Sequence, residues 1–223
     1  MTSGQIVIGN WRVRGLAAPI VYLCEYLAVP YRMHHYELGG PPDYSKAEFR
    51  NAKDGLNMPF ANLPYVIDGE IRVAQSLACS RYICRKWAPE LLGKGPRDLA
   101  LVDTMSQVLH DDRLQVQGVL GYGSPERQPI VDEGLRRLAV FMDHMADHAF
   151  LAGDYVTYID FICWEIIDFV NAVGEGRILA FHPRLAAYLA RVSDLPRFRE
   201  YLASERFLIR GGDSCLVALS PEL

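Results

Sequence analysis

The sequence predicts an α+β fold in two parts, an N-terminal part of alternating strands and helices followed by an all-helical part. Over the first 87 residues, β-branched runs alternate with segments of helical periodicity. Residues 88–96 hold two prolines and two glycines, a composition typical of a linker between domains. Beyond them, apolar residues recur only at helical spacing. We therefore expect one domain at residues 1–87 and a helical-bundle domain at residues 97–223.

The N-terminal part begins with a short β-branched run at residues 5–9, which predicts a strand. A helix should follow, because apolar residues then recur at steps of four, three and four: Leu16, Ile20, Leu23 and Leu27. Residues 31–36 are expected to form a second strand. A strand, helix, strand unit of this length implies parallel pairing through a right-handed crossover.

A turn at residues 39–42 and a weakly helical stretch through Asn51 come next. Two short apolar runs then flank Asp68-Gly69, a dipeptide that strongly predicts a two-residue hairpin turn. Gln75-Ser76 opens another helix that runs to about residue 86, with Ser76 as its expected cap. The resulting order, βαβαββα, is the order of a thioredoxin-like domain.

The helical part is predicted to contain at least three helices. Apolar periodicity indicates a long helix from Leu99 to Leu120 and a second helix that includes Leu135 to Met145. A third, at residues 158–173, is apolar on nearly every side, which is typical of a helix in the middle of a bundle. Thr157 and Asp160 should form a capping box at its start.

Composition excludes several function classes. The formal net charge is -4 and the basic residues are scattered, so no basic face is available for nucleic acid. No stretch approaches the roughly 18 apolar residues of a spanning helix, and the N-terminus lacks the apolar region of a signal peptide. The five cysteines are well separated and odd in number, as expected for buried reduced thiols. These features predict a cytoplasmic protein without a membrane partner.

Several short motifs lie along the chain in a fixed order: Trp11 with Arg14-Gly15-Leu16-Ala17, Cys24-Glu25-Tyr26, Pro42-Asp43-Tyr44, Asn62-Leu63-Pro64-Tyr65, Ile67-Asp68-Gly69, Gln75-Ser76, Arg81-Tyr82-Ile83 and Arg206-Phe207-Leu208. Each motif alone is weak, but their joint order within a βαβαββα frame is specific. Together they resemble the mu-class cytosolic glutathione transferases up to about residue 210. The resemblance implies a cytoplasmic homodimer that uses glutathione as a co-substrate, needs no other cofactor, and takes a small apolar electrophile.

Physical chemistry supports a tripeptide site at two of these motifs. In a thioredoxin-like domain the proline before the third strand is cis, and Pro64 is the candidate. The backbone of Leu63 would then face outward and pair with the cysteinyl unit of glutathione, as an added strand does. The helix that opens at Gln75-Ser76 offers free N–H groups and a positive dipole end to the γ-glutamyl carboxylate.

The resemblance implies roles for further residues. It assigns the glycine-end carboxylate of glutathione to Trp11, Lys53 and Asn62, with Phe49 where the family usually has a tryptophan. It also implies that Asp111 reaches the γ-glutamyl ammonium across the dimer interface and that Phe60 inserts into the partner subunit. Leu16 and Tyr122 are the expected wall of the electrophile site.

The chain departs from the family at Asn10, because the family has a tyrosine there whose hydroxyl donates a hydrogen bond to the sulfur of glutathione. A free thiol has a pKa of about 8.5, and only a few per cent is ionised at neutral pH. A hydrogen bond to a charged group contributes about 1.5 to 3 kcal/mol, and the shorter, less acidic amide of Asn10 is expected to weaken thiolate activation roughly ten- to a hundredfold. Arg14, the Trp11 indole and Tyr122 are the alternative donors.

Because of Asn10, a second hypothesis stays open, in which the same fold binds glutathione or a hydrophobic ligand without catalysis. A dithiol oxidoreductase is excluded, since residues 10–14 contain no cysteine. A metal site is not expected either. His144 and His148 have a suitable spacing of four, but no third ligand has recognisable spacing.

Overall fold

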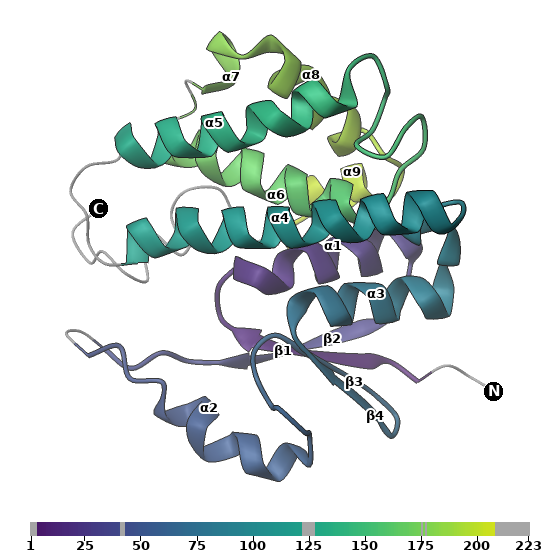
Figure 1. The fold of residues 1–223 in the computed structure, drawn as a ribbon. Coiled ribbons are helices and arrows are strands. Elements are labelled where there is room, and N and C mark those ends of the chain that lie inside the picture. Colours follow the sequence, from purple (N-terminus) through teal and green to yellow (C-terminus); the bar gives the residue numbers. More distant parts are fainter. Residues whose placement is uncertain (1–3, 41–42, 122–127, 175, 177, 208–223) are drawn as a thin grey trace.

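The protein was analysed as a computed structural model that describes residues 4–40, 43–121, 128–174, 176 and 178–207. A four-stranded sheet forms one layer, with helices α1 and α3 on one face and α2 toward the other (Figure 1). The helical bundle packs on the outer side of α1 and α3. The structure is therefore a thioredoxin-like domain followed by a helical domain, as the sequence predicts.

The sheet has the strand order β2-β1-β3-β4. It consists of β1 (Ile6–Trp11), β2 (Tyr31–Tyr36), β3 (Tyr65–Asp68) and β4 (Ile71–Ala74). Strands β1 and β2 pair in parallel, which confirms the predicted parallel pairing, and the other pairs are antiparallel. The hairpin turn lies one residue later than predicted: Asp68 pairs with Ile71, so Gly69 and Glu70 form the turn, and Gly69 supplies a φ of 58°.

Five helical segments in the described part of the chain belong to the same domain as the sheet. They are η1 (Gly15–Ala17), α1 (Ala18–Leu27), α2 (Ala47–Ala52), η2 (Lys53–Leu56) and α3 (Ser76–Trp87). The prediction that Ser76 caps α3 was wrong, because Ser76 is the first helical residue. Gln75 is the N-cap, with a φ of 74° and no side-chain capping bond. The tight turn from β4 into α3 takes a positive φ at Gln75, so the N-cap lies one residue earlier than predicted.

The remaining elements form the helical part. They are η3 (Pro89–Leu92), α4 (Pro96–Gly121), α5 (Gln128–Met145), α6 (Tyr158–Val173), α7 (Ile178–Phe181), α8 (Pro183–Ser193) and α9 (Phe198–Leu202). Helix α6 is buried almost throughout, which confirms its predicted central place. The capping box of Thr157 and Asp160 is present at its start.

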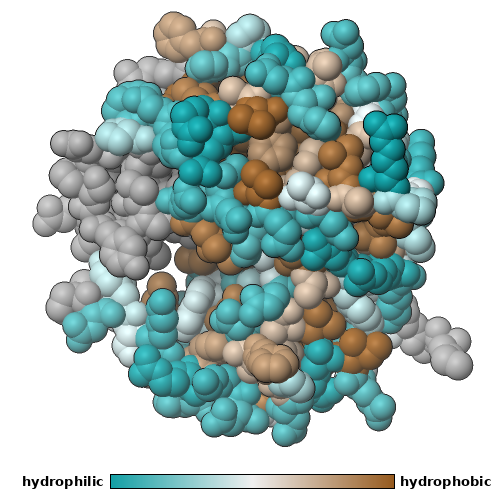
Figure 2. Space-filling model, viewed as in Figure 1, coloured by the Kyte–Doolittle hydropathy of each residue, from teal (hydrophilic) through white to brown (hydrophobic). Residues whose placement is uncertain are grey.

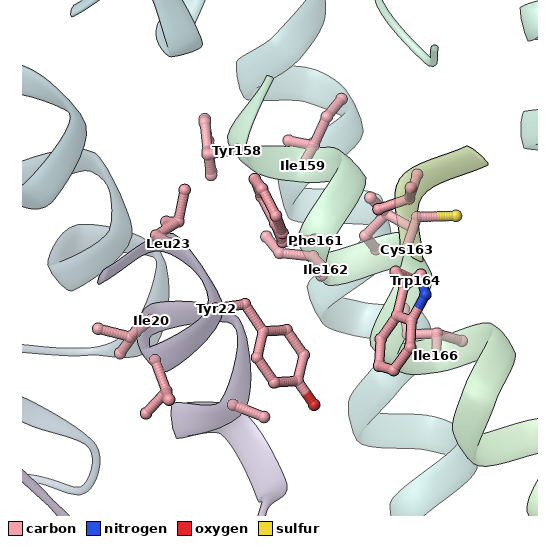
Figure 3. Packing of buried hydrophobic residues seen from close by; sticks show 14 of the residues in the cluster. Ile20, Tyr22, Leu23, Tyr158, Ile159, Phe161, Ile162, Cys163, Trp164 and Ile166 are labelled. Atoms are coloured by element: carbon pink, nitrogen blue, oxygen red, sulfur yellow. The ribbon is translucent and has the colours of Figure 1, made fainter. Parts of the chain in front are cut away.

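One hydrophobic core extends through both domains (Figure 3). Tyr22 of α1 points toward Trp164 of α6, with 5.4 Å between the centres of the two rings. A smaller core lies on the other face of the sheet: Tyr36, Phe49, Met58 and Tyr65. Helix α1 therefore joins the sheet to the bundle.

Four cysteines are buried free thiols, namely Cys24, Cys79, Cys84 and Cys163. Cys215 lies outside the described residues. Burial raises the pKa of Cys79 and of Cys84 to about 12, which keeps these thiols protonated at neutral pH. Within the described part of the chain, no helix is both long enough and apolar enough to cross a membrane.

Candidate functional site

Strand register brings three of the predicted motifs to one end of the sheet. Gly9 of β1 pairs with Tyr65 of β3, and Tyr65 pairs with Ala74 of β4. The residues that continue from these positions, Asn10, Pro64 and Gln75, therefore lie at the same end. An added Cβ at Gly9 would lie 2.1 Å from the Tyr65 ring, so only glycine permits this close approach of β1 and β3. The candidate site is this end of the sheet.

Asn10 lies at the end of β1 and is only 3% exposed. Its Nδ2 donates to the backbone carbonyl of Val13 at 3.0 Å, which closes the turn between β1 and η1. One of the two amide N–H groups of Asn10 is therefore engaged in a local bond. The side chain stabilises the turn.

Arg14, which follows in the same turn, points into the boundary between the domains. Its guanidinium donates to Asp168 Oδ2 at 2.8 Å and to Glu165, and it is 9% exposed. Burial alone would lower the pKa of Arg14, but the charge of Glu165 raises it above the usual value. Both terminal nitrogens are thus engaged with α6.

Glu165 is the centre of this buried cluster. It also accepts from Arg113 Nη2 at 3.0 Å and from the Tyr22 hydroxyl at 2.5 Å. Burial acts to raise the pKa of Glu165, but Arg14 and Arg113 together hold it below its usual value. Sequence reasoning missed Glu165 and Arg113. The available signal was an acidic residue in the middle of a helix that is apolar on nearly every side.

The loop before β3 and the start of α3 form the second part of the site. The Leu63–Pro64 peptide bond is cis, as predicted. The Leu63 N–H donates to Asn62 Oδ1 at 2.9 Å, so the amide that was expected to pair with a ligand is engaged by its neighbour. The positive φ of Gln75 is a costly conformation for a non-glycine residue, and such conformations often occur at binding sites.

Trp11 has an aromatic support behind it. The centre of its ring lies 6.0 Å from the centre of the Phe49 ring and 6.3 Å from that of the Tyr36 ring, and both contacts are edge-on. Phe49 is buried in the smaller core, where it packs against Trp11. Lys53 is exposed at the first position of η2.

A small cavity lies between the domains beside the start of α3. It offers about 20 Å³ for the centres of water-sized molecules, enough for one water. The predicted residues Leu16 and Ser76 both line it, together with His110 and Arg113. Because His110, Arg113 and Glu165 line it, this cavity has a polar wall on the bundle side.

The other predicted residues lie elsewhere. Asp111 is exposed on α4, and Phe60 is 91% exposed with a φ of 57°. Tyr122 lies outside the described residues. Among the residues that the structure describes, no group of three His, Cys, Asp or Glu side chains could hold a metal ion.

The chain is similar to known proteins in sequence and in fold. Residues 125–205 match the family model described as glutathione S-transferase, C-terminal domain. The chain is 32% identical to glutathione S-transferase Mu 1 of Rattus norvegicus, over 91% of this chain and 93% of that protein. It is 33% identical to glutathione S-transferase Mu 2 of Pongo abelii, over 92% and 94%. The solved pi-class glutathione S-transferase of Onchocerca volvulus has the same fold, with a TM-score of 0.76 at 22% identity over 90% of this chain and 93% of that one.

Proposed function

This chain belongs to the glutathione S-transferase family, and from that premise we propose that it binds glutathione and transfers its thiolate to a small apolar electrophile. The observation that supports this most directly is the shared end of the sheet, where Trp11, Leu63 and the start of α3 meet. An extended peptide there has a backbone edge at Leu63 and a helix N-terminus at Ser76. Lys53 and Asn62 supply polar groups for its other carboxylate.

The proposed reaction is a nucleophilic substitution or addition at carbon. The sulfur of glutathione loses its proton to solvent, and the thiolate attacks the electrophilic carbon. In a chloroarene, the chloride then leaves with the electron pair of its bond. The chain's own part is to hold the tripeptide and to favour the ionised thiol.

A second candidate function is binding without catalysis, and the Asn10 side chain favours it. Its amide donates to Val13 and is much shorter than a tyrosine, so the sulfur lacks the donor that the family's tyrosine would supply. On this alternative, glutathione or an apolar ligand occupies the site and is not turned over.

We include a homodimer and a cytoplasmic location in the proposal. Phe60 projects from the loop before β3, where an aromatic side chain would insert into a partner. Apolar side chains are also exposed on α4 and α5, namely Val108, Leu114 and Val140. Figure 2 shows hydrophobic residues interspersed with hydrophilic ones over the face that α4 and α5 present in Figure 1. Such a mixed face is typical of subunit interfaces.

Calorimetry with glutathione tests the binding site. The wild-type protein should bind glutathione, and Ser76→Ala should weaken the affinity about tenfold, because a hydrogen bond to a charged group is lost. Ser45→Ala is the matched control, since the exposed Ser45 lies just before α2 and its hydroxyl accepts from Ala47 N at 3.2 Å. Absence of heat at millimolar glutathione would refute the binding site itself.

Turnover of 1-chloro-2,4-dinitrobenzene separates the two functions. Conjugation above the uncatalysed rate supports the transferase. Retention on glutathione-agarose, with no turnover of halide, peroxide or isomerase substrates, supports the binding protein.

A further inference from the structure

The turn between β1 and η1 links two parts of the proposed site. Asn10 and Trp11 at its start belong to the glutathione side, and Leu16, just after it, is the expected wall of the electrophile site. Within the turn, Asn10 Nδ2 donates to the Val13 carbonyl, and Val13 N donates to the Trp11 carbonyl at 2.7 Å. A further backbone bond joins the turn to β2. These bonds close the turn, but they do not fix its position relative to the helical domain.

Arg14 ties this turn to the helical domain. Its Nη1 donates to Asp168 Oδ2 at 2.8 Å and its Nη2 donates to Glu165, both on α6. Glu165 also accepts from Arg113 Nη2 on α4 at 3.0 Å and from the Tyr22 hydroxyl on α1 at 2.5 Å. The Glu165 side chain is only 3% exposed, so water does not compete for these bonds. One carboxylate therefore joins the turn to helices α1, α4 and α6.

The same carboxylate borders the proposed site. Glu165 lines the small cavity between the domains together with Gly15 and Leu16. Gly15 is also close to Asn10, because a Cβ added at Gly15 would lie 4.0 Å from Asn10 Nδ2. Since Gly15 directly follows Arg14, a shift of Arg14 away from α6 would move the wall of this cavity as well as the turn.

We propose that Glu165 is a positioning residue for the transfer reaction: through Arg14 it holds the turn at the distance from the helical domain at which thiolate and electrophile meet. This role presupposes the transfer reaction proposed above. A misplacement of about 1 Å can reduce a rate roughly a hundredfold, so the rate of transfer depends steeply on this distance. The ion pairs of Glu165 do not include Leu63 or Ser76. Binding of glutathione should therefore depend on Glu165 much less than the rate does.

Steady-state kinetics with glutathione and 1-chloro-2,4-dinitrobenzene, together with calorimetry, test this role. Glu165→Gln replaces one carboxylate oxygen by an NH2 group, which cannot accept from an arginine. Its kcat should fall at least about tenfold. Its Kd for glutathione should change by less than about threefold. Glu165→Asp keeps the charge, and its kcat should lie between those of Glu165→Gln and the wild type.

The direction of the change separates position from charge. Glu165→Gln removes a negative charge, and a nearby negative charge disfavours the ionisation of a thiol. If Glu165 acted only through its charge, Glu165→Gln would favour the thiolate and raise kcat at neutral pH. A fall in kcat is therefore expected from a loss of position alone, and a rise would overturn the proposal.

Asp112→Asn is the matched control for a general loss of stability. Asp112 is buried on α4, and its ion-pair partner, Arg137, belongs to α5. The variant should lower the free energy of unfolding, as Glu165→Gln does, because both leave an arginine without a buried carboxylate. It should leave kcat unchanged. An equal loss of kcat in the two variants would assign the effect to stability and overturn the role of Glu165.

Hydrogen exchange measures the turn directly and without turnover. The backbone amides of Arg12 and Val13 donate to β2 and within the turn. They should exchange faster in Glu165→Gln than in the wild type or in Asp112→Asn, because the turn has lost its tie to α6. Unchanged exchange in Glu165→Gln would overturn the proposal even if kcat falls.

A second variant decides the case if Glu165→Gln does not fold. Asp168→Asn removes the other carboxylate to which Arg14 donates and leaves Glu165 in place. Its kcat should fall about tenfold, and its turn amides should exchange faster. A wild type without turnover would refute the proposed function, and this role with it. An active wild type whose turn and kcat are unchanged in the α6 variants would refute only the role of Glu165.

Discussion

The boundary between the domains and the end of the sheet hold their polar groups in opposite ways. At the boundary, Arg14, Arg113 and Glu165 come from three distant segments, are almost fully buried and pair with one another. At the end of the sheet, Asn10 and Asn62 bond to backbone groups within three residues. The first set is completed only by folding of the whole chain. The second is held by short local bonds, which a ligand can replace at little cost.

The largest expected effect follows from removing the centre of the buried cluster. Glu165→Ala leaves Arg14 and Arg113 without their shared carboxylate, and should lower the free energy of unfolding by about 3 to 5 kcal/mol. Chemical denaturation measures this. In the control, Glu37→Ala removes the exposed partner of Arg12 and should cost less than about 1 kcal/mol. Similar losses in both variants would contradict the claim that the buried cluster contributes more to stability than an exposed ion pair.

A smaller effect, on activity, is expected at the end of the sheet. Asn10→Tyr restores a phenolic donor near the sulfur and should raise kcat/KM with 1-chloro-2,4-dinitrobenzene roughly ten- to a hundredfold. Asn10→Ala is the control, because it also removes the bond to Val13 but adds no donor. If both variants change activity alike, the effect comes from the turn and not from the hydroxyl.

The smallest effect is a pH dependence of the cluster. The folded-state pKa of Glu165 lies below the ordinary 4.5, so its contribution to stability is complete above pH 4.5 and is lost as the pH falls through the lowered value. Denaturation of the wild type and of Glu165→Gln at several pH values isolates this contribution. The difference in the free energy of unfolding between the two proteins should be constant from pH 7 to about 5 and should decrease in acid. A difference in the free energy of unfolding that widens in acid would show that folding raises the pKa of Glu165 and does not lower it.

Much of the fold was predictable because periodicity and turn chemistry are local. Residues 31–36 and 158–173 were placed at their observed bounds, and the capping box at Thr157 was found from its spacing alone. Errors arose where a turn takes its own backbone geometry, as at Gly69 and Gln75. Helices α7 and α9 have four and five residues, too few for a periodic pattern to be recognised.

The candidate site was predictable where motifs sit next to strand ends, and not where distant residues meet. The family resemblance singled out Asn10, Pro64 and Gln75, and the strand register places all three at one end of the sheet. The pair of Arg14 and Glu165 spans 151 positions, and no local pattern links such partners. The expectation that Leu63 presents a free amide overlooked Asn62, whose side chain engages that amide.

Arg14 belongs to the same turn as Asn10 but makes its ion pairs with α6. Consider a hybrid protein that joins residues 1–87 of this chain to the helical half of a relative. It would keep Arg14, but the α6 positions that pair with Arg14 would come from the relative. For Arg14 to keep its ion pairs, the hybrid would also need Glu165 and Asp168. Exchange of the two halves between relatives is thus restricted by Arg14. This residue lies far in sequence from the linker at residues 88–96, where the halves would be joined.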